Sequence, residues 1–269
     1  MTYAGFLPPL VLVLLYATAA VMYLHWFLRR DNGGAGRSIF LGATVLLHLG
    51  WTVHAGVSLG RHPVATVPEF ASFTALCLAG IYLASEIIHR NRHGGVFAIP
   101  AVTLLQLIAV LSAGSDPSLR PGLEQSRFGL HTGVLCGAWA SFVLSFIYAV
   151  MLILFHRALR RRQFGRIFEQ LPPLAVLCRM MNRTAFVGFI LLGIGIGAGL
   201  VEMASVRGIT LDVRLMSAGL GWLIYGFLLL SHLLPEWTER RTAIFNTIAF
   251  VSLILVAVGH AFCDSWHRW

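Results

Sequence analysis

The 269-residue chain contains no lysine, and only 12% of its residues are charged. A soluble domain carries about 25% charged residues, whereas 57% of this chain is hydrophobic and its mean hydropathy is +0.77. These values exclude a soluble globular protein, a disordered chain and the usual kind of nucleic-acid-binding protein, so we expect no nucleic-acid partner. They predict a polytopic membrane protein.

Several chemistries are also missing. There is no Walker loop, which excludes ATP-driven transport within this chain. The four cysteines form no CxxC pair, so neither a thioredoxin-like carrier nor a structural zinc site is expected, and the lack of CxxCH excludes a c-type cytochrome. Carboxylates are scarce in the apolar runs. Glu86 and Glu202 lie near run ends, where we expect them to reach water, which disfavours a proton-driven transporter.

What is present is a series of eight apolar runs, each close to the ~20 residues that a membrane helix needs. They predict an all-α fold: a polytopic integral membrane bundle of eight transmembrane helices within a single transmembrane domain, residues 1–269. An even number of helices places both termini on one side. The runs lie near Gly5–Phe27, Ser38–Leu59, Glu69–Ile88, Val96–Ala113, Phe128–Phe155, Thr184–Ser205, Arg214–Leu234 and Ala243–Phe262.

The net charge of +9 comes from 20 arginines, and their distribution predicts the orientation. Fourteen lie in the loops after the first, third, fifth and seventh runs, and six lie in the opposite loops and the tail. The positive-inside rule therefore places both termini outside the cytoplasm, in a cytoplasmic (inner) bacterial membrane. The first run is not expected to be a cleaved signal peptide, because no basic residue precedes it.

The longest basic connection follows the fifth run. Its stretch Arg157–Arg166 has two interpretations, an anchor on anionic lipid or a docking site for a partner. The segment LPPLAVLCRMM that follows predicts a short amphipathic helix on the inner surface. Beyond it, Gly193 and Gly197 have the four-residue spacing that lets helices approach closely, with a narrow groove for a flat cofactor as the alternative.

Eleven histidines are the unusual feature of so weakly charged a chain. His131 and His260 lie about one turn from the outer ends of the fifth and eighth runs. Two imidazoles at matching depth on different helices can bind haem iron from opposite faces, which predicts bis-histidine haem b. The alternative is two separate histidines, each bonded to a backbone carbonyl.

The outer arginines complete this hypothesis, because haem propionates favour cations. Candidates on the same side include Arg61, Arg127 and Arg214. A second, inner set consists of His232, at the inner end of the seventh run, and His48, near the middle of the second; these two form either another haem station or polar contacts.

Five segments resemble cytochrome c assembly proteins of the CcsA and CcmC type, over about residues 62–266. The resemblance implies haem handling at the outer face, with His131 and His260 as axial ligands and His232 as a further histidine in the membrane. The segments are RHPVATVPEFASFTALCLAGIYLASE, LHTGVLCGAWASFVLSFIYAVMLIL, LPPLAVLCRMMNRTAFVGFILLGIGIGAG, LDVRLMSAGLGWLIYGFLLLSH and VSLILVAVGHAFCDSW.

One motif of that family is absent. Its haem-delivering members carry WGxxWxWD before the helix that ends in His, where this chain reads ASVRGITLDVRLMSAG and keeps only Asp212. The chain is therefore more similar to the HemX-like or YpjD-like branch. We expect a haem-handling or cytochrome c maturation factor rather than a conventional enzyme, with apocytochrome c or another assembly protein as partner. The alternatives are a HemX-type regulatory or scaffold protein and, less favoured, a small-solute transporter.

Overall fold

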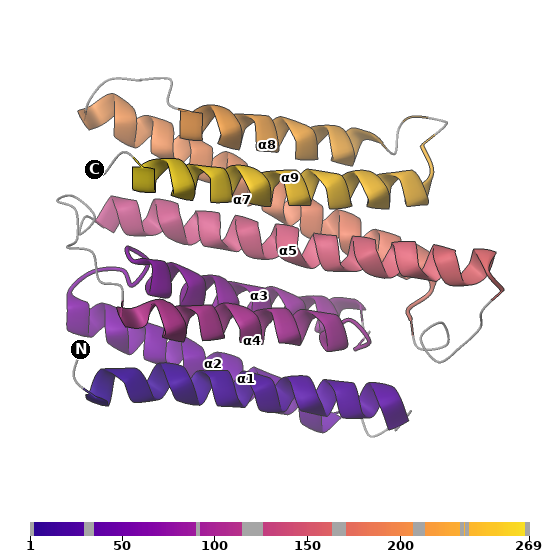
Figure 1. Cartoon of the computed structure of the whole chain (residues 1–269), viewed down its shortest axis with the longest axis horizontal. Helices are drawn as coiled ribbons and strands as arrows, with labels where there is room; N and C mark the ends of the chain where they lie inside the picture. The colour runs from indigo at the N-terminus through magenta and orange to yellow at the C-terminus, as the bar shows by residue number, and fades with distance from the viewer. Residues whose placement is uncertain are drawn as a thin grey trace. The chain divides into compact units, whose positions relative to one another are not determined.

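A computed structural model describes residues 3–29, 35–89, 92–114, 126–162, 171–206, 213–231, 234 and 237–266. Within these ranges, the side chains of residues 3–6, 35, 126–128, 202, 205, 206, 214, 258 and 260–266 are not described. The described residues form eight α-helices and a short 3-10 turn, without a strand, so the all-α prediction is confirmed (Figure 1).

Each predicted apolar run corresponds to one helix. The agreement follows from the uniform apolar character of the runs, because a chain in lipid must satisfy its backbone hydrogen bonds internally and so forms helices. The helices are α1 (Tyr3–Arg29), α2 (Ala35–Leu59), α3 (Val67–His89), α4 (Gly95–Leu111), α5 (Ser126–Arg160), α7 (Leu174–Val206), α8 (Val213–Leu230) and α9 (Glu239–Trp266).

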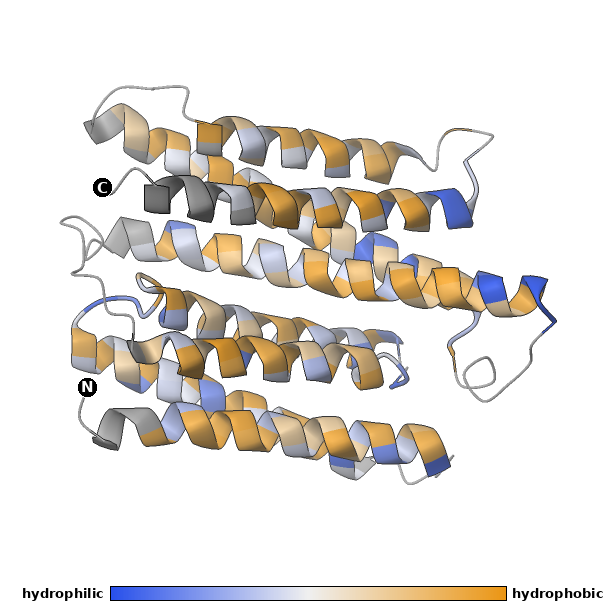
Figure 2. Ribbon diagram, in the orientation of Figure 1, coloured by the Kyte–Doolittle hydropathy of each residue, from blue (hydrophilic) through white to orange (hydrophobic). Residues whose placement is uncertain are grey.

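Six of these helices are long and apolar enough to cross a membrane, and α4 and α8 contain shorter apolar stretches, Gly95–Leu111 and Leu215–Leu230. Figure 2 shows hydrophobic residues along the helices and hydrophilic ones toward several helix ends. Many large apolar side chains are exposed, such as Leu46 at 68% and Val57 at 78%. Soluble proteins rarely expose large apolar patches, so these faces indicate contact with lipid.

The predicted short surface helix after the basic stretch is wrong. Residues 174–181 are the first two turns of α7, which continues without a break to Val206. Leu177, Met180 and Met181 are fully buried there. The apolar stripe that suggested an amphipathic helix therefore packs against protein, and the membrane helix starts about ten residues earlier than its most apolar part.

The chain divides into two compact units, residues 1–140 and 141–269; the single domain over 1–269 stays a prediction. In the first unit α2 and α4 each pack against both α1 and α3 (Figure 1). Its core contains three fully buried tyrosines, Tyr16, Tyr23 and Tyr82. Their hydroxyls must find partners inside the bundle, and they organise the polar contacts described below.

In the second unit α8 packs against α7 and α9. Close approach depends on small residues, as is usual between membrane helices: a Cβ on Gly193 would lie 2.9 Å from Nε1 of Trp222. Close packing is therefore confirmed at Gly193, whereas a Cβ on Gly197 would meet no described atom within 4 Å. In the same unit, Asn246 donates a 2.8 Å hydrogen bond to Ser145.

Candidate functional site

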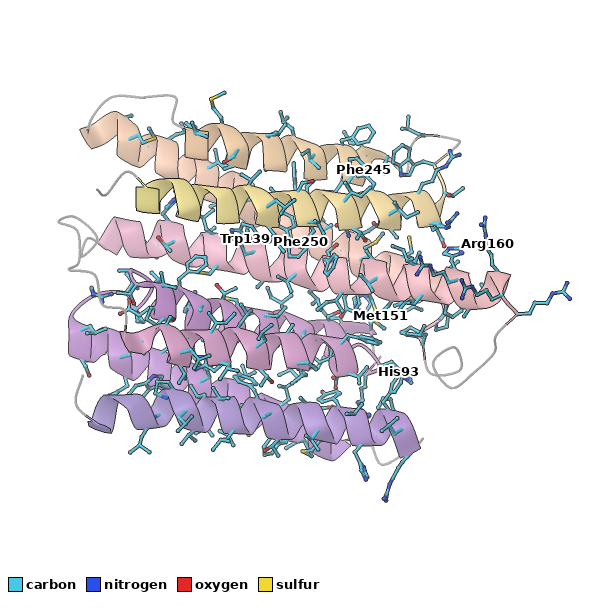
Figure 3. All side chains as sticks on the ribbon, in the orientation of Figure 1. His93, Trp139, Met151, Arg160, Phe245 and Phe250 are labelled. Atoms are coloured by element: carbon cyan, nitrogen blue, oxygen red, sulfur yellow. The ribbon has the colours of Figure 1, made fainter. Side chains whose placement is uncertain are left out.

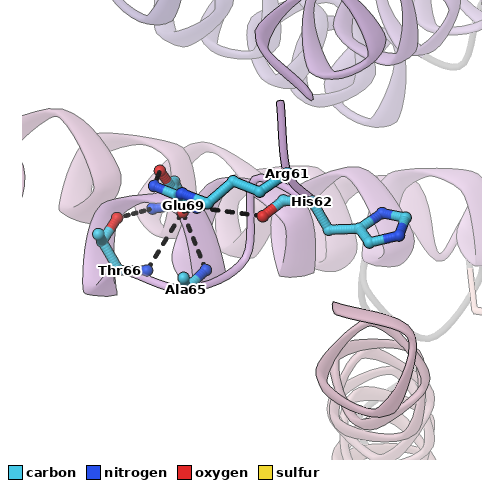
Figure 4. Close-up of polar contacts among 5 residues, drawn as sticks. All are labelled: Arg61, His62, Ala65, Thr66 and Glu69. Atoms are coloured by element: carbon cyan, nitrogen blue, oxygen red, sulfur yellow. Dashed lines mark hydrogen bonds and ion pairs between the residues drawn. The ribbon is translucent and has the colours of Figure 1, made fainter. Parts of the chain in front are cut away.

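The loop between α2 and α3 is fixed by one carboxylate. α2 ends at Leu59, and the next residue, Gly60, has a φ of +63°, the left-handed conformation that favours glycine after a helix. Both oxygens of Glu69 accept 2.7 Å hydrogen bonds from the guanidinium of Arg61. Oε2 also accepts from the backbone N–H groups of Ala65 and Thr66 (Figure 4). The loop is thereby tied to the first turn of α3.

The sequence T-x-x-E from Thr66 to Glu69 explains this arrangement, because it is a capping box. The Thr66 hydroxyl accepts from the N–H of Glu69 at 3.4 Å, and the Glu69 carboxylate accepts from the N–H of Thr66 at 3.2 Å. Arg61, whose side chain is only 7% exposed, adds a bidentate ion pair. The predicted propionate ligand Arg61 thus already holds a carboxylate of its own chain.

The same loop places His62 against the start of α5. A Cβ on Gly129 would lie 2.3–2.5 Å from three atoms of the His62 side chain, so only glycine allows this contact. His62 is not among the site residues predicted from the sequence, and its side chain is exposed. Two sequence features could have predicted its position. One is the capping box that fixes the loop, and the other is Gly129 in the sequence FGLH.

His131 follows two residues later in α5, and its side chain is half-buried. Its Nδ1 atom is buried and has no hydrogen-bond partner among the described residues. Leaving a buried polar atom unsatisfied costs about 1–3 kcal/mol, and no described residue offsets this cost. Imidazole is a usual ligand of haem iron, so the side-chain type of His131 fits that role.

The other predicted ligands are placed in less detail. His260 lies in the helical backbone of α9, Arg127 in the first turn of α5 and Arg214 in the first turn of α8; the side chains of these three are not among those described. His232 lies outside the described residues. His131 belongs to the first unit and His260 to the second.

His48 is completely buried, and both of its ring nitrogens have partners. The Tyr16 hydroxyl lies 3.0 Å from Nδ1, and the Ser72 hydroxyl lies 3.0 Å from Nε2. Ser72 donates its own proton to Oε1 of Gln106 at 2.9 Å, so Nε2 of His48 must donate to Ser72 and Nδ1 must accept from Tyr16. Gln106 in turn donates to the carbonyl of Pro9. In this series of hydrogen bonds, each residue donates to the next, from Tyr16 through His48, Ser72 and Gln106 to Pro9.

Glu86 corrects a second expectation. It does not reach water but is 3% exposed, with hydroxyl groups of Tyr23 at 2.6 Å and Tyr82 at 2.7 Å donating to Oε2. Ser38 donates to Oε1, and Nε of Arg92 lies 3.5 Å from the same atom. Three hydroxyl donors from three helices therefore replace its hydration, which position along the sequence alone does not reveal.

Among the described residues, no three His, Cys, Asp or Glu side chains gather in a way that could hold a metal ion. The candidate site is therefore His131, a half-buried imidazole in the first unit. Gly129, two residues before it, contacts His62 of the loop that the Arg61–Glu69 pair ties to α3.

Comparison with known proteins identifies the family of the chain. The family model described as cytochrome C assembly protein matches residues 7–267. Protein HemX of Brevibacillus brevis is 24% identical over 263 residues, which cover 96% of each chain. The inner membrane protein YpjD of Escherichia coli is 25% identical over 175 residues, 64% of this chain and 66% of that protein.

The cytochrome c biogenesis protein CcsA of Chlorella vulgaris is 22% identical over 280 residues, covering 88% of this chain and 87% of that protein. The resemblance read from the sequence is thereby confirmed, including the HemX and YpjD branch. The membrane-length helices and the inner-membrane relative indicate a multi-pass inner membrane protein. The chain belongs to the cytochrome C assembly protein family.

Proposed function

We propose that this protein binds haem b near the outer face of the inner membrane and acts in haem handling during cytochrome c maturation. His131 and His260 are the two axial ligands. Both termini and both histidines lie on the extracytoplasmic side, as the distribution of the 20 arginines favours. Family membership supports a role in cytochrome c maturation. The single observation that supports the haem site is the buried Nδ1 atom of His131, which has no hydrogen-bond partner among the described residues.

His131 would provide iron with one imidazole nitrogen, and His260 would provide a second. Arg127 and Arg214, each in the first turn of its helix, hold the propionates. Arg61 contributes by orienting the loop, because two of its nitrogens already bind Glu69. Bound haem supplies the iron chemistry, and the protein supplies position and exclusion of water.

A second station, formed by His48 and His232, is part of this proposal. His48 would have to release Tyr16 or Ser72 before it binds iron. Occupation of this station therefore requires breaking a buried hydrogen bond, and we expect it to bind haem more weakly than the outer pair. The partner that receives haem is apocytochrome c or another assembly protein, since the chain itself carries no CxxCH motif.

The test is the absorption spectrum of the full chain, purified in detergent, in the oxidised and reduced states. We expect a low-spin Soret band and a sharp α band, both lost in His131→Ala and His260→Ala. His54→Ala is the matched control, because His54 is exposed near the outer end of α2, where its ring makes a tilted contact with that of Trp51. A colourless wild-type protein that does not take up added haem would overturn the proposal.

A HemX-type regulatory or scaffold role is the second candidate, favoured by the full-length match to a protein named HemX. The end of α5 then docks a cytoplasmic partner, because Arg157, Arg160 and Arg161 are exposed there (Figure 3). Replacing these three by glutamine would abolish partner binding in this case. The haem proposal instead predicts an unchanged haem spectrum in the same variant.

A further inference from the structure

A cluster of cationic and aromatic side chains lies at the other end of the first unit from the Arg61 loop, where α1 ends and α2 and α4 begin. The Cζ atom of Arg37 sits 3.8 Å above the ring of Trp26 and 5.6 Å from the ring of Tyr23. The His93 ring lies 4.9 Å from the Trp26 ring (Figure 3). We call Tyr23, Trp26, Arg37, Arg92 and His93 the Trp26 cluster.

The described carboxylate of this region does not neutralise the cluster. Glu86 accepts from the hydroxyls of Tyr23, Tyr82 and Ser38, and Arg92 adds a long 3.5 Å ion pair. Its oxygens are thus occupied by three hydroxyl donors and one arginine. Two arginines face this one saturated carboxylate. Burial, together with the charge of Arg37, lowers the pKa of His93.

Arg37 is the most unusual member. Its side chain is 5% exposed, and its Nε atom is buried without a hydrogen-bond partner among the described residues. It also occupies the first turn of α2, where the helix macrodipole is positive and disfavours a cation. Aromatic stacking offsets only part of this cost. A buried arginine in this position is therefore suited to bind an anion.

A second helix N-terminus meets the same cluster. α4 starts at Gly95 and has no side-chain cap, since its N-cap residue is Gly94. A Cβ on Gly95 would lie 2.2 Å from Cδ1 of Tyr23 and 2.7 Å from the hydroxyl of Tyr82, so the helix start is pressed against the cluster. The N–H groups of Gly95 and Phe97 already donate to the carbonyls of Arg92 and Gly94, so this helix start attracts an anion through the positive end of its macrodipole.

We propose that the Trp26 cluster binds the phosphate group of an anionic membrane lipid. Arg37 and Arg92 hold the phosphate, with the N-termini of α2 and α4 adding partial positive charge. A lipid fits better than a free phosphate ion, because exposed apolar side chains adjoin the cluster: Leu24 and Leu28 on α1 and Ile39 on α2 are 47%, 56% and 69% exposed. The acyl chains of a bound lipid lie along these residues.

The test is native mass spectrometry of the full chain, delipidated in detergent and titrated with phosphatidylglycerol or with phosphatidylcholine of the same acyl chains. We expect phosphatidylglycerol to bind at least about tenfold more tightly, a difference of about 1.4 kcal/mol. Arg37→Gln and Arg92→Gln each reduce that preference about fivefold or more. Arg92 is 42% exposed, so its variant folds even if Arg37→Gln does not.

Arg160→Gln is the matched control, because Arg160 is an exposed arginine at the end of α5. It keeps the full preference, and so does the wild type in 10 mM inorganic phosphate. Displacement of phosphatidylglycerol by inorganic phosphate would overturn the lipid as the source of the anion. Equal binding of the two lipids, or an undiminished preference in Arg92→Gln, would overturn the site itself.

Discussion

Removal of the Glu69 carboxylate is the most informative perturbation of the loop between α2 and α3. Glu69→Ala deletes two 2.7 Å bonds from Arg61 and two bonds from backbone N–H groups. It leaves Arg61, whose side chain is 7% exposed, without its counter-ion. Breaking a buried pair costs about 3–5 kcal/mol and losing a helix cap about 1 kcal/mol. Because Glu69 is 20% exposed, we expect the lower end, about 3 kcal/mol.

Thermal unfolding of the full chain in detergent, followed by tryptophan fluorescence, measures this cost. With about 2–4 °C per kcal/mol for a chain of this size, Glu69→Ala lowers the midpoint by about 6–12 °C. Arg61→Met combined with Glu69→Ala is expected to recover a large part of that loss, since it removes the unpaired charge. A shift below about 2 °C, or no recovery in the double variant, would refute the account of the loop.

Two further predictions concern packing and pH. Gly129→Ala, which places a Cβ 2.3 Å from His62, destabilises the protein in the same unfolding assay, whereas Gly133→Ala, with its nearest contact at 3.6 Å, is tolerated; equal midpoints would contradict the loop placement. Burial and the charge of Arg37 lower the pKa of His93 in the folded chain. As the pH falls, His93 therefore takes up a proton in the unfolded chain before it does so in the folded chain. Stability contributed by neutral His93 is therefore complete above about pH 6.5 and falls as the pH drops below it. We expect the unfolding midpoint of the wild type to fall more between pH 7 and pH 5 than that of His93→Gln. An equal change in the two proteins would disprove this linkage.

The helices follow from the sequence because each needs only a long apolar run, and α3 illustrates this. The predicted start of α3 is Glu69, and the observed start is Val67. The two residues between the capping Thr66 and Glu69 belong to the first turn of the helix. The predicted start of α7 is too late, because polar residues alternate with Leu177, Met180 and Met181 and so favour a helix on the membrane surface. Burial by neighbouring helices is a tertiary property that one segment does not encode.

The candidate site is predictable only in part for the same reason. Depth along a helix predicts that His131 is an outer histidine, but only the packing shows that its Nδ1 atom is buried and has no partner in the part of the chain that the structure describes. Glu86 was expected in water because it lies near a helix end, yet Tyr23 donates to it from another helix. Such contacts join residues 63 positions apart, and no local pattern in the sequence reports them.

The most direct test of the central claim is chemical rescue of the His131 ligand. The spectrum of His131→Gly is recorded in the reduced state, before and after addition of imidazole, beside the wild type and His54→Gly. The account predicts that His131→Gly loses the low-spin α band and regains it with imidazole, while His54→Gly retains it throughout. An unchanged low-spin spectrum in His131→Gly, without added imidazole, would contradict the role of His131 as an axial ligand.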